Sequence, residues 1–174
     1  MGFNMSYFNN FSTLMYDPKG DGSAKLAINI LKRVRVRAHM KKEIIMLDKY
    51  DVQENETPEI VADRHHGSPY YHWVVMILND ISDVNHDWVK STRQLQKYIQ
   101  IKYTEAQLDE VHHYEIAQSS CDTTIKIQVP QGTSGATPIT NYEYETALNE
   151  EKRRIDLLRN DYLGYFTEEF ANLV

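Results

Sequence analysis

The apolar and polar positions follow clear periods between residues 50 and 81. Residues 50–52 (Tyr-Asp-Val) alternate as in a half-buried strand. Apolar residues then recur at helical spacing, which predicts one helix over 58–65 and a second over about 70–79. Strand, helix and helix therefore follow one another directly, and this order indicates one small supersecondary unit.

Both predicted helices begin with the same two residue types. Thr57-Pro58 and Ser68-Pro69 each place a capping side chain before a proline, whose missing N–H costs nothing in the first helical turn. Gly67 is suited to end the first helix. The positions expected to face inward are Ile60, Val61 and His65 in the first helix and Tyr70, Trp73, Val74, Ile77 and Leu78 in the second. The second helix is apolar nearly all round, so its other side faces either this chain or a partner protein.

The N-terminal part of the chain has a weaker pattern. Residues 7–16 are expected to form an extended arm, 17–22 a turn and 24–31 a short helix. Over 32–37 two valines alternate with Arg33, Arg35 and Arg37, which predicts a strand with three guanidinium groups on one face. That face is either solvated or meets an acidic partner surface or phosphate.

The C-terminal half changes period several times. Ser91 and Thr104 each open a capping box, which predicts a helix after Ser91 and a shorter one from Thr104 to about residue 111. Strict alternation over 113–116 and 123–129 predicts a β-hairpin. The remaining expectations are a polar loop over 83–87, a mobile loop over 130–140, a helix from Asn141 to about 152, a strand or helix extension over 154–158, and a terminal amphipathic helix, capped by Asn160 or Asp161, that buries Leu163, Phe166, Phe170 and Leu173.

Composition narrows the class of protein. The net charge of −6 argues against a general nucleic-acid binder. No apolar run reaches the roughly 18 residues that a membrane-spanning helix needs, and the first residues lack the pattern of a secretory signal. Cys121 is the single cysteine, which excludes an intrachain disulfide and is consistent with a reducing cytoplasm. Twelve tyrosines suit either a small core with hydroxyls at its edge or a protein interface.

Candidate chemistry is sparse. His65, His66, His72, His112 and His113 lack the spacing with cysteine or carboxylate that metal sites show. Cys121 falls in the predicted hairpin turn without an activating histidine, and no Gly-x-Ser-x-Gly elbow or phosphate-binding glycine loop occurs. We therefore expect no catalytic, cofactor-binding or metal-binding residues, no cofactor and no small-molecule substrate, and we expect that the protein is not an enzyme.

Four stretches together carry a family resemblance. ETPEIVADRHHGSPYYHWVVMILNDI (56–81) resembles the baseplate wedge protein 53 family of contractile-tailed bacteriophages. NILKRVRVR (29–37), HHYEI (112–116) and NYEYETALNEEKRRIDLLRNDYLGYFTEEF (141–170) follow in the order that the resemblance implies. The resemblance implies a structural subunit of the tail baseplate wedge. Such a subunit binds neighbouring wedge proteins and helps join wedges into a six-fold baseplate.

The central unit also resembles a LysM module, and this gives an alternative function. LysM modules commonly bind N-acetylglucosamine polymers such as peptidoglycan or chitin. Here Glu54-Asn55-Glu56-Thr57 replaces the usual Gly-Asp-Thr turn, and Tyr70-Tyr71-His72-Trp73 enlarges the second helix. These departures favour reuse of the module for protein contact.

The predicted fold class is α+β, with a small LysM-like strand-helix-helix core. We expect an N-terminal arm and basic strand over 1–48, the LysM-like core over 49–111, a β-hairpin and flexible loop over 112–140, and a C-terminal helical segment over 141–174 that packs on the core or on a partner. The resemblance favours a strand over 154–158.

The expected partners are other wedge proteins of the same phage, with no nucleic acid and no membrane. The predicted location is the tail baseplate of the virion, with synthesis and assembly in the host cytoplasm. The residues predicted to contact partners are Arg33, Arg35, Tyr71, His72, Phe166 and Phe170.

Overall fold

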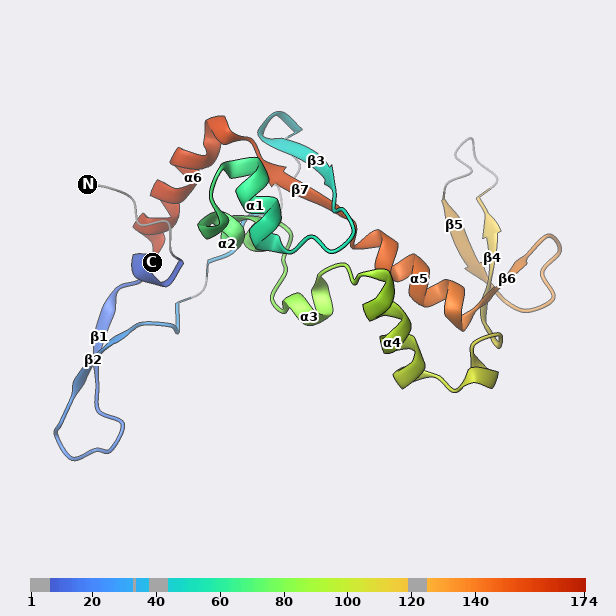
Figure 1. Ribbon diagram of the computed structural model, residues 1–174, viewed down its shortest axis with the longest axis horizontal. Helices are drawn as coiled ribbons and strands as arrows, with labels where there is room; N and C mark the ends of the chain where they lie inside the picture. The colour runs from blue at the N-terminus through green and yellow to red at the C-terminus, as the bar shows by residue number, and fades with distance from the viewer. Residues whose placement is uncertain (1–6, 33, 38–43, 119–124) are drawn as a thin grey trace. The chain divides into compact units, whose positions relative to one another are not determined.

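A computed structural model describes residues 7–32, 34–37, 44–118 and 125–174. Its fold is α+β, as predicted, with several small antiparallel sheets among helices (Figure 1). Contacts group the chain into two compact units: a first unit of residues 1–87 with 154–174, and a second unit of residues 88–153. The predicted division into four segments stays a prediction, since these units follow contacts rather than sequence order.

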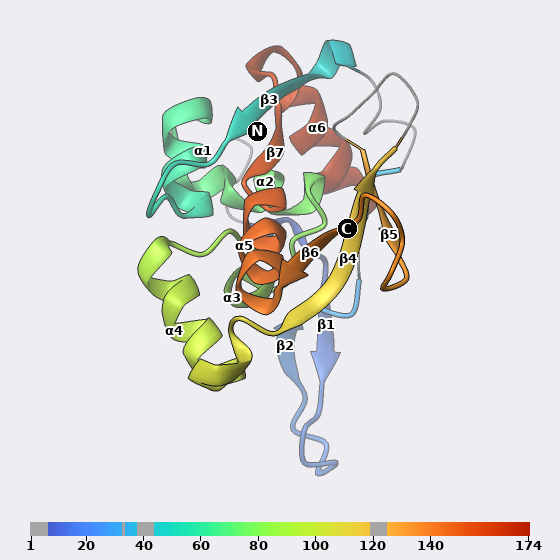
Figure 2. The same ribbon diagram turned by 90° about the vertical axis from the view of Figure 1, so that its right-hand side faces the viewer.

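The first unit is organised around an antiparallel pair of strands, β3 (Leu47–Asp51) and β7 (Arg154–Leu158). Figure 2 shows the two strands side by side. Their register runs from Leu47 opposite Leu158 to Asp51 opposite Arg154. The strand predicted over 154–158 is therefore confirmed, and Ile155 and Leu157 point into the core on alternate positions. The partner strand of β3 thus comes from outside the predicted core range of 49–111.

Helix α1 (Pro58–His66) begins where the sequence predicted and ends one residue later than predicted. Thr57 is its N-cap, and Gly67 ends it in the left-handed conformation, with φ of 74°. The prediction that Ile60 faces inward was wrong, because its side chain is 44% exposed. The buried positions are Pro58, Val61 and Ala62, whose spacing of three and four residues defines the inward face of a helix.

The second predicted helix is split. A 3₁₀ turn, Pro69–Tyr71, is capped by the Ser68 side chain, and it leads into α2 (His72–Leu78). Trp73, Val74 and Leu78 are buried as expected, but Tyr70 is 61% exposed because it lies in the 3₁₀ turn rather than on the face of α2.

One cluster of buried side chains in the core of the first unit joins α2 to Phe11 and to the C-terminal residues. It consists of Phe11, Trp73, Val74, Leu78, Leu158, Phe170 and Val174. Phe170 lies on α6 (Asn160–Leu173), and its ring centroid is 4.6 Å from that of Trp73. The ring centroid of Tyr7 lies 4.9 Å from that of Phe11 and 5.3 Å from that of Phe170. The prediction of an extended arm over 7–16 was therefore partly wrong, because Tyr7–Asn10 form a 3₁₀ turn packed on this core.

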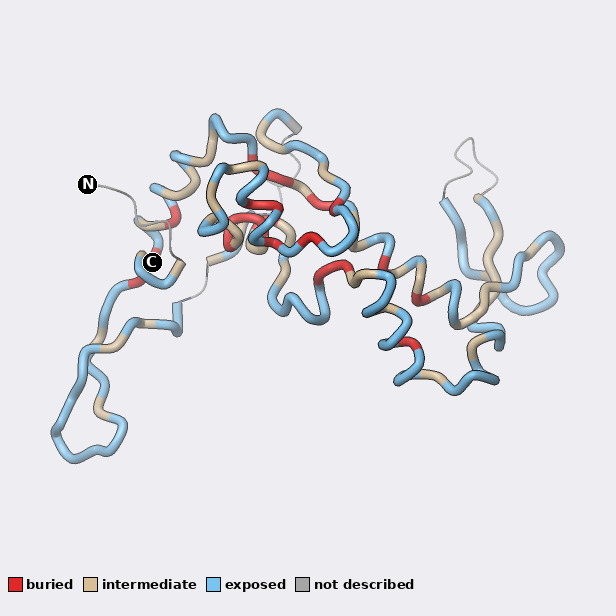
Figure 3. Tube along the Cα trace, in the orientation of Figure 1, coloured by how far each residue is buried: buried red, intermediate tan, exposed pale blue. Residues whose placement is uncertain are grey.

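Residues 24–31 do not form the predicted helix. Instead β2 (Lys25–Ile28) pairs antiparallel with β1 (Thr13–Tyr16), and residues 17–22 form the predicted turn. The Asp17 carboxylate accepts the backbone N–H groups of Gly20 and Gly22, each at 2.8 Å. This turn brings the following residues back alongside β1, so a strand ladder replaces local helical bonds. The hairpin is almost wholly exposed (Figure 3).

The second unit combines two helices with a three-stranded sheet. Its elements are α4 (Thr92–Lys102), β4 (Val111–Ala117), β5 (Lys126–Val129), β6 (Thr137–Thr140) and α5 (Asn141–Glu151), and the strand order is β5-β4-β6. The predicted hairpin is confirmed by the β4–β5 pairing. The loop predicted over 130–140 was partly wrong, because its last four residues form β6 and pair with β4.

Several boundaries also differ from the prediction. The polar loop over 83–87 contains a single helical turn, α3 (Val84–Asp87). The helix after Thr104 is only the 3₁₀ turn Glu105–Gln107, since β4 takes over at Val111. Helix α5 begins at Asn141 with Thr140 as its N-cap, and the N-cap of α6 is Arg159 rather than the expected Asn160 or Asp161. At the end of α6, Leu173 is 56% exposed and Val174 is buried in its place.

Candidate partner-binding surface

Residues 34–37 run between two hollows in the first unit. The Trp73 pocket, of about 750 Å³, is lined by Tyr7, Phe8, Val34, Arg35, His72, Trp73, Met76, Ile77, Asp80, Ile81 and Ser82. The Tyr162 pocket, of about 670 Å³, is lined by Val34, Arg35, Val36, Arg37, Met46, Leu158, Tyr162, Tyr165, Phe166, Glu168, Glu169, Phe170, Asn172 and Leu173. Both pockets have mainly apolar and aromatic walls, which suits the binding of another protein.

Residues 34–37 keep the predicted alternation but do not form the predicted strand. Val34 and Val36 are half-buried and pack against the core of the first unit, whereas Arg35 and Arg37 are exposed. This burial has the period of two that a strand shows, although no strand pairs with these residues within the described chain. Just before this segment, Lys32 Nζ donates a hydrogen bond to the backbone oxygen of Val174 at 2.7 Å.

The structure brings most of the predicted contact residues to this region. Arg35 lines both pockets, His72 lines the Trp73 pocket, and Phe166 and Phe170 line the Tyr162 pocket. Tyr71 packs against the same core, and Arg33 lies outside the described residues. Phe170 is only 2% exposed, so it supports the pocket from the core and we leave it out of the proposed contact surface.

Opposite charges line the Tyr162 pocket. Arg35 and Arg37 come from one wall, and Glu168 and Glu169 come from α6. Within the described part of the chain, neither arginine forms an ion pair. Two guanidinium groups beside apolar walls are therefore available to carboxylates from outside.

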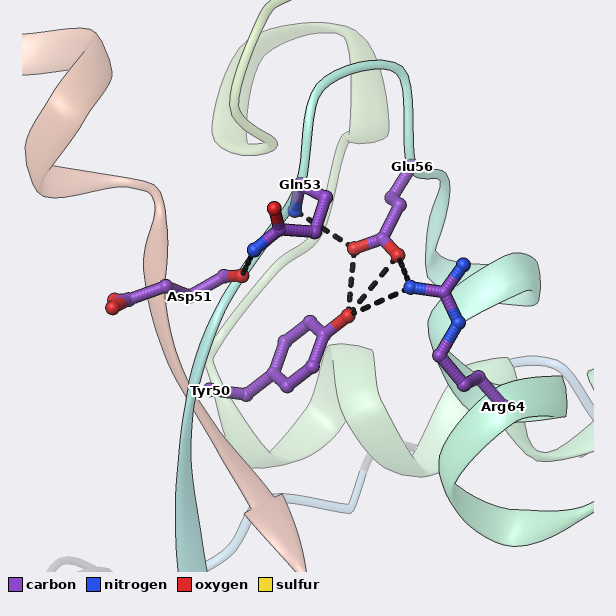
Figure 4. A network of polar contacts seen from close by, with 5 residues as sticks. All are labelled: Tyr50, Asp51, Gln53, Glu56 and Arg64. Atoms are coloured by element: carbon purple, nitrogen blue, oxygen red, sulfur yellow. Dashed lines mark hydrogen bonds and ion pairs between the residues drawn. The ribbon is translucent and has the colours of Figure 1, made fainter.

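A polar network shapes the turn between β3 and α1 (Figure 4). The buried Glu56 carboxylate accepts the Tyr50 hydroxyl at 2.8 Å and the Gln53 N–H at 2.8 Å, and it pairs with the Arg64 guanidinium. Burial, followed by the hydrogen bond to Glu56, raises the pKa of Tyr50. The Glu56 carboxylate is therefore engaged by donors of the same chain.

Asn160 ties the end of α1 to the start of α6. Its Nδ2 donates to the His65 oxygen at 2.8 Å, so its Oδ1 is the atom that faces His66 Nδ1 at 2.9 Å. His66 Nδ1 therefore carries a proton, and its buried Nε2 has no hydrogen-bond partner among the described groups. Burial, the largest cause, lowers the pKa of His66.

The Asn79 side chain joins the end of α2 to β7, and the contact with β7 was not predicted from the sequence. Its Nδ2 donates to the oxygens of Val75 and Asp156, at 2.9 and 2.8 Å, and its Oδ1 accepts the Asp156 N–H at 2.8 Å. The side chain thus caps α2 and also pairs with the backbone of β7. The sequence signal was an asparagine at the end of a helix, which predicts the cap but not the strand.

The second unit contains its own buried polar groups. The Glu145 carboxylate accepts Lys102 Nζ at 2.5 Å and the Tyr103 hydroxyl at 2.9 Å. The hydrogen bond to Glu145 is the main reason that the pKa of Lys102 is raised. Glu145 and Asn149 are the two buried residues of α5, and each polar group finds its partner only in the tertiary fold.

His112 and His113 lie beside each other on β4. The His112 ring stacks on Tyr144 with 3.8 Å between centroids, and His113 Nε2 lies 2.9 Å from a Glu115 oxygen. The hydrogen bond from His113 is the main reason that the pKa of Glu115 is lowered. The ring contacts with Tyr144 join β4 to α5 within the second unit.

The described residues contain no group of three or more histidine, cysteine or acidic side chains able to hold a metal ion. None of their helices is long and apolar enough to cross a membrane. Cys121 lies outside them.

Comparison with known families gives one match. A family model described as base plate wedge protein 53 matches residues 8–121. No curated protein matches the chain. Three of the stretches that carry the resemblance (29–37, 56–81 and 112–116) lie inside the matched range, while 141–170 lies outside it. The match gives no support to the glycan-binding alternative.

Proposed function

The chain belongs to the base plate wedge protein 53 family, and we propose that it binds neighbouring wedge proteins through the Trp73 and Tyr162 pockets. Membership makes it a structural protein of the phage tail baseplate wedge and suggests a role other than catalysis. We further propose that it helps join wedges into a six-fold baseplate, and that this assembly takes place in the host cytoplasm.

The observation that supports partner binding is the apolar surface around residues 34–37. Aromatic side chains line both pockets, and two of them, Phe8 and Tyr165, are more than half exposed. Apolar patches of this kind on a structural subunit are typical of contact sites. A neighbouring protein seated there would cover side chains that the first unit, with its small core, leaves in water.

Sedimentation velocity tests the proposal directly. The purified chain is mixed with the other wedge proteins of the same phage, which are first shown to be competent to assemble. A discrete larger complex is expected, and closed six-fold rings that appear only with this chain would support the joining role. Absence of any complex at micromolar concentrations would refute partner binding.

Matched surface variants locate the contact. Phe8→Ser in the Trp73 pocket and Tyr165→Ser in the Tyr162 pocket are each expected to weaken the complex about tenfold or more, because exposed aromatic anchors often dominate such interfaces. Tyr142→Ser is the control, since Tyr142 is exposed on α5 and lines neither pocket. An equal effect of all three variants would contradict the assignment to the pockets.

A further inference from the structure

The backbone of residues 34–37 makes no hydrogen bond to any described group. Each of these residues carries an N–H donor and a C=O acceptor that folded chains usually pair. The half-buried valines hold the segment against the core, so its polar edge stays in place. A fixed row of open donors and acceptors is what an added strand pairs with.

The Tyr162 pocket is the side on which an added strand fits. All four residues of the segment line it, whereas only Val34 and Arg35 line the Trp73 pocket. Strands pair at about 4.8 Å, so an added strand would lie directly over this pocket. Its inward side chains would meet Met46, Leu158 and Phe166.

The positive charges of Arg35 and Arg37 favour acidic residues at the outward positions of the added strand. Arg35 and Arg37 lie two positions apart on the exposed face, and residues directly opposite in neighbouring strands have their Cβ atoms about 5 Å apart. Carboxylates at alternate positions would therefore meet both guanidinium groups. Glu168 and Glu169 on the far wall repel carboxylates, which keeps the acidic side chains on the arginine side.

We propose that residues 34–37 accept a β-strand from a neighbouring wedge protein, and that this strand alternates apolar residues with aspartate or glutamate. This inference rests on the proposed function, since it names how the partner binds. It assigns affinity to backbone pairing and apolar contact, and specificity to the two arginines.

Amide hydrogen exchange of the full chain, alone and in complex with the wedge proteins, is the test. The amides of residues 34–37 are expected to exchange rapidly in the free chain. In the complex, the exchange rate of the amides of residues 34 and 36, or of residues 35 and 37, should fall about tenfold or more. The reason is that the N–H groups on one edge of the segment become hydrogen-bonded to the added strand. Protection of α6 alone would contradict strand addition.

A charge-reversal pair tests the nature of the partner. Arg35→Glu with Arg37→Glu is expected to weaken the complex about tenfold or more, because it sets like charges against each other. Arg93→Glu with Lys97→Glu changes the net charge equally on the exposed face of α4 and should change affinity less than about twofold.

The outcomes separate this inference from the proposed function. A complex that forms with unchanged exchange at 34–37 overturns strand addition and leaves partner binding standing. Equal affinity of the arginine double variant and the parent overturns the acidic character of the strand. Failure of competent wedge proteins to bind the chain at all overturns both proposals.

Discussion

Replacing Asn79 by alanine should destabilise the first unit substantially. The side chain makes two hydrogen bonds to the backbone of Asp156 and one to Val75, all between 2.8 and 2.9 Å. An antiparallel strand points both polar groups of a residue to one edge, so Asp156 presents its N–H and its oxygen to Asn79 and would lose both bonds.

The expected loss in the free energy of unfolding follows from the number of hydrogen bonds that Asn79→Ala removes. A typical intramolecular hydrogen bond contributes about 1 kcal/mol net, and a buried group left unpaired costs about 1–3 kcal/mol. Because Asn79 is only half-buried, water can reach part of the gap. We therefore expect the free energy of unfolding to fall by about 2–3 kcal/mol. With a urea m-value of about 1.5 kcal/mol per molar, the midpoint would fall by about 1.5–2 M.

Urea unfolding followed by tryptophan fluorescence measures this change. A Trp88→Phe background leaves Trp73 in the core of the first unit as the reporter. Asn172→Ala is the control, because Asn172 is an exposed residue on α6 and its change should stay within about 0.5 kcal/mol. Asn79→Asp should cost at least as much as alanine, since it sets an oxygen against two carbonyl oxygens. If Asn79→Ala lowers the free energy of unfolding no more than Asn172→Ala does, the hydrogen bonds of Asn79 do not stabilise the first unit as proposed.

Three further predictions concern buried polar groups. Glu56→Ala should lower the free energy of unfolding by about 2 kcal/mol, because it removes the acceptor of three donors, while Arg64→Ala should cost less because the arginine side chain is mostly exposed; equal losses in urea unfolding would contradict this order. The lowered pKa of His66 means that the unfolded chain binds its proton first, so stability should be independent of this group above about pH 6.5 and fall as the pH drops below it. His66→Gln should remove that part of the decline in urea midpoints between pH 7.5 and 5.5, and an unchanged pH profile would refute the assignment. Lys102→Met should lower the stability of the second unit by about 2 kcal/mol, because Glu145 stays buried without its cation; Lys97→Met, which removes an exposed lysine from the same helix, is the control, and thermal unfolding that does not distinguish the two would count against the pair.

The arrangement of residues 34–37 in the candidate surface could be predicted from the sequence. Alternation of valine and arginine over 32–37 correctly placed Val34 and Val36 toward the core and Arg35 toward solvent. The two pockets could not be predicted, because their walls combine residues from the N-terminal arm, α2 and α6. Segments so far apart in the chain meet only when the first unit folds.

Several helix and strand boundaries could be predicted from the amino-acid sequence because their signals are local. Pro58 marked the start of α1, and Ser68 with Pro69 marked the start of the turn before α2. Gly67 marked the end of α1, and period-two alternation marked the β4–β5 hairpin. These features depend on backbone geometry and on side chains within a few residues, so they can be read without the fold.

Other features depend on residues far away in the chain and could be known only from the folded structure. β2 is a strand because β1 lies opposite it, and β7 closes the sheet on β3 although the whole second unit separates them in the chain. Glu145 and Asn79 are placed by the groups that they bond. Strand pairing and the satisfaction of buried polar groups join residues far apart in the sequence, and local propensity is too weak to specify such partners.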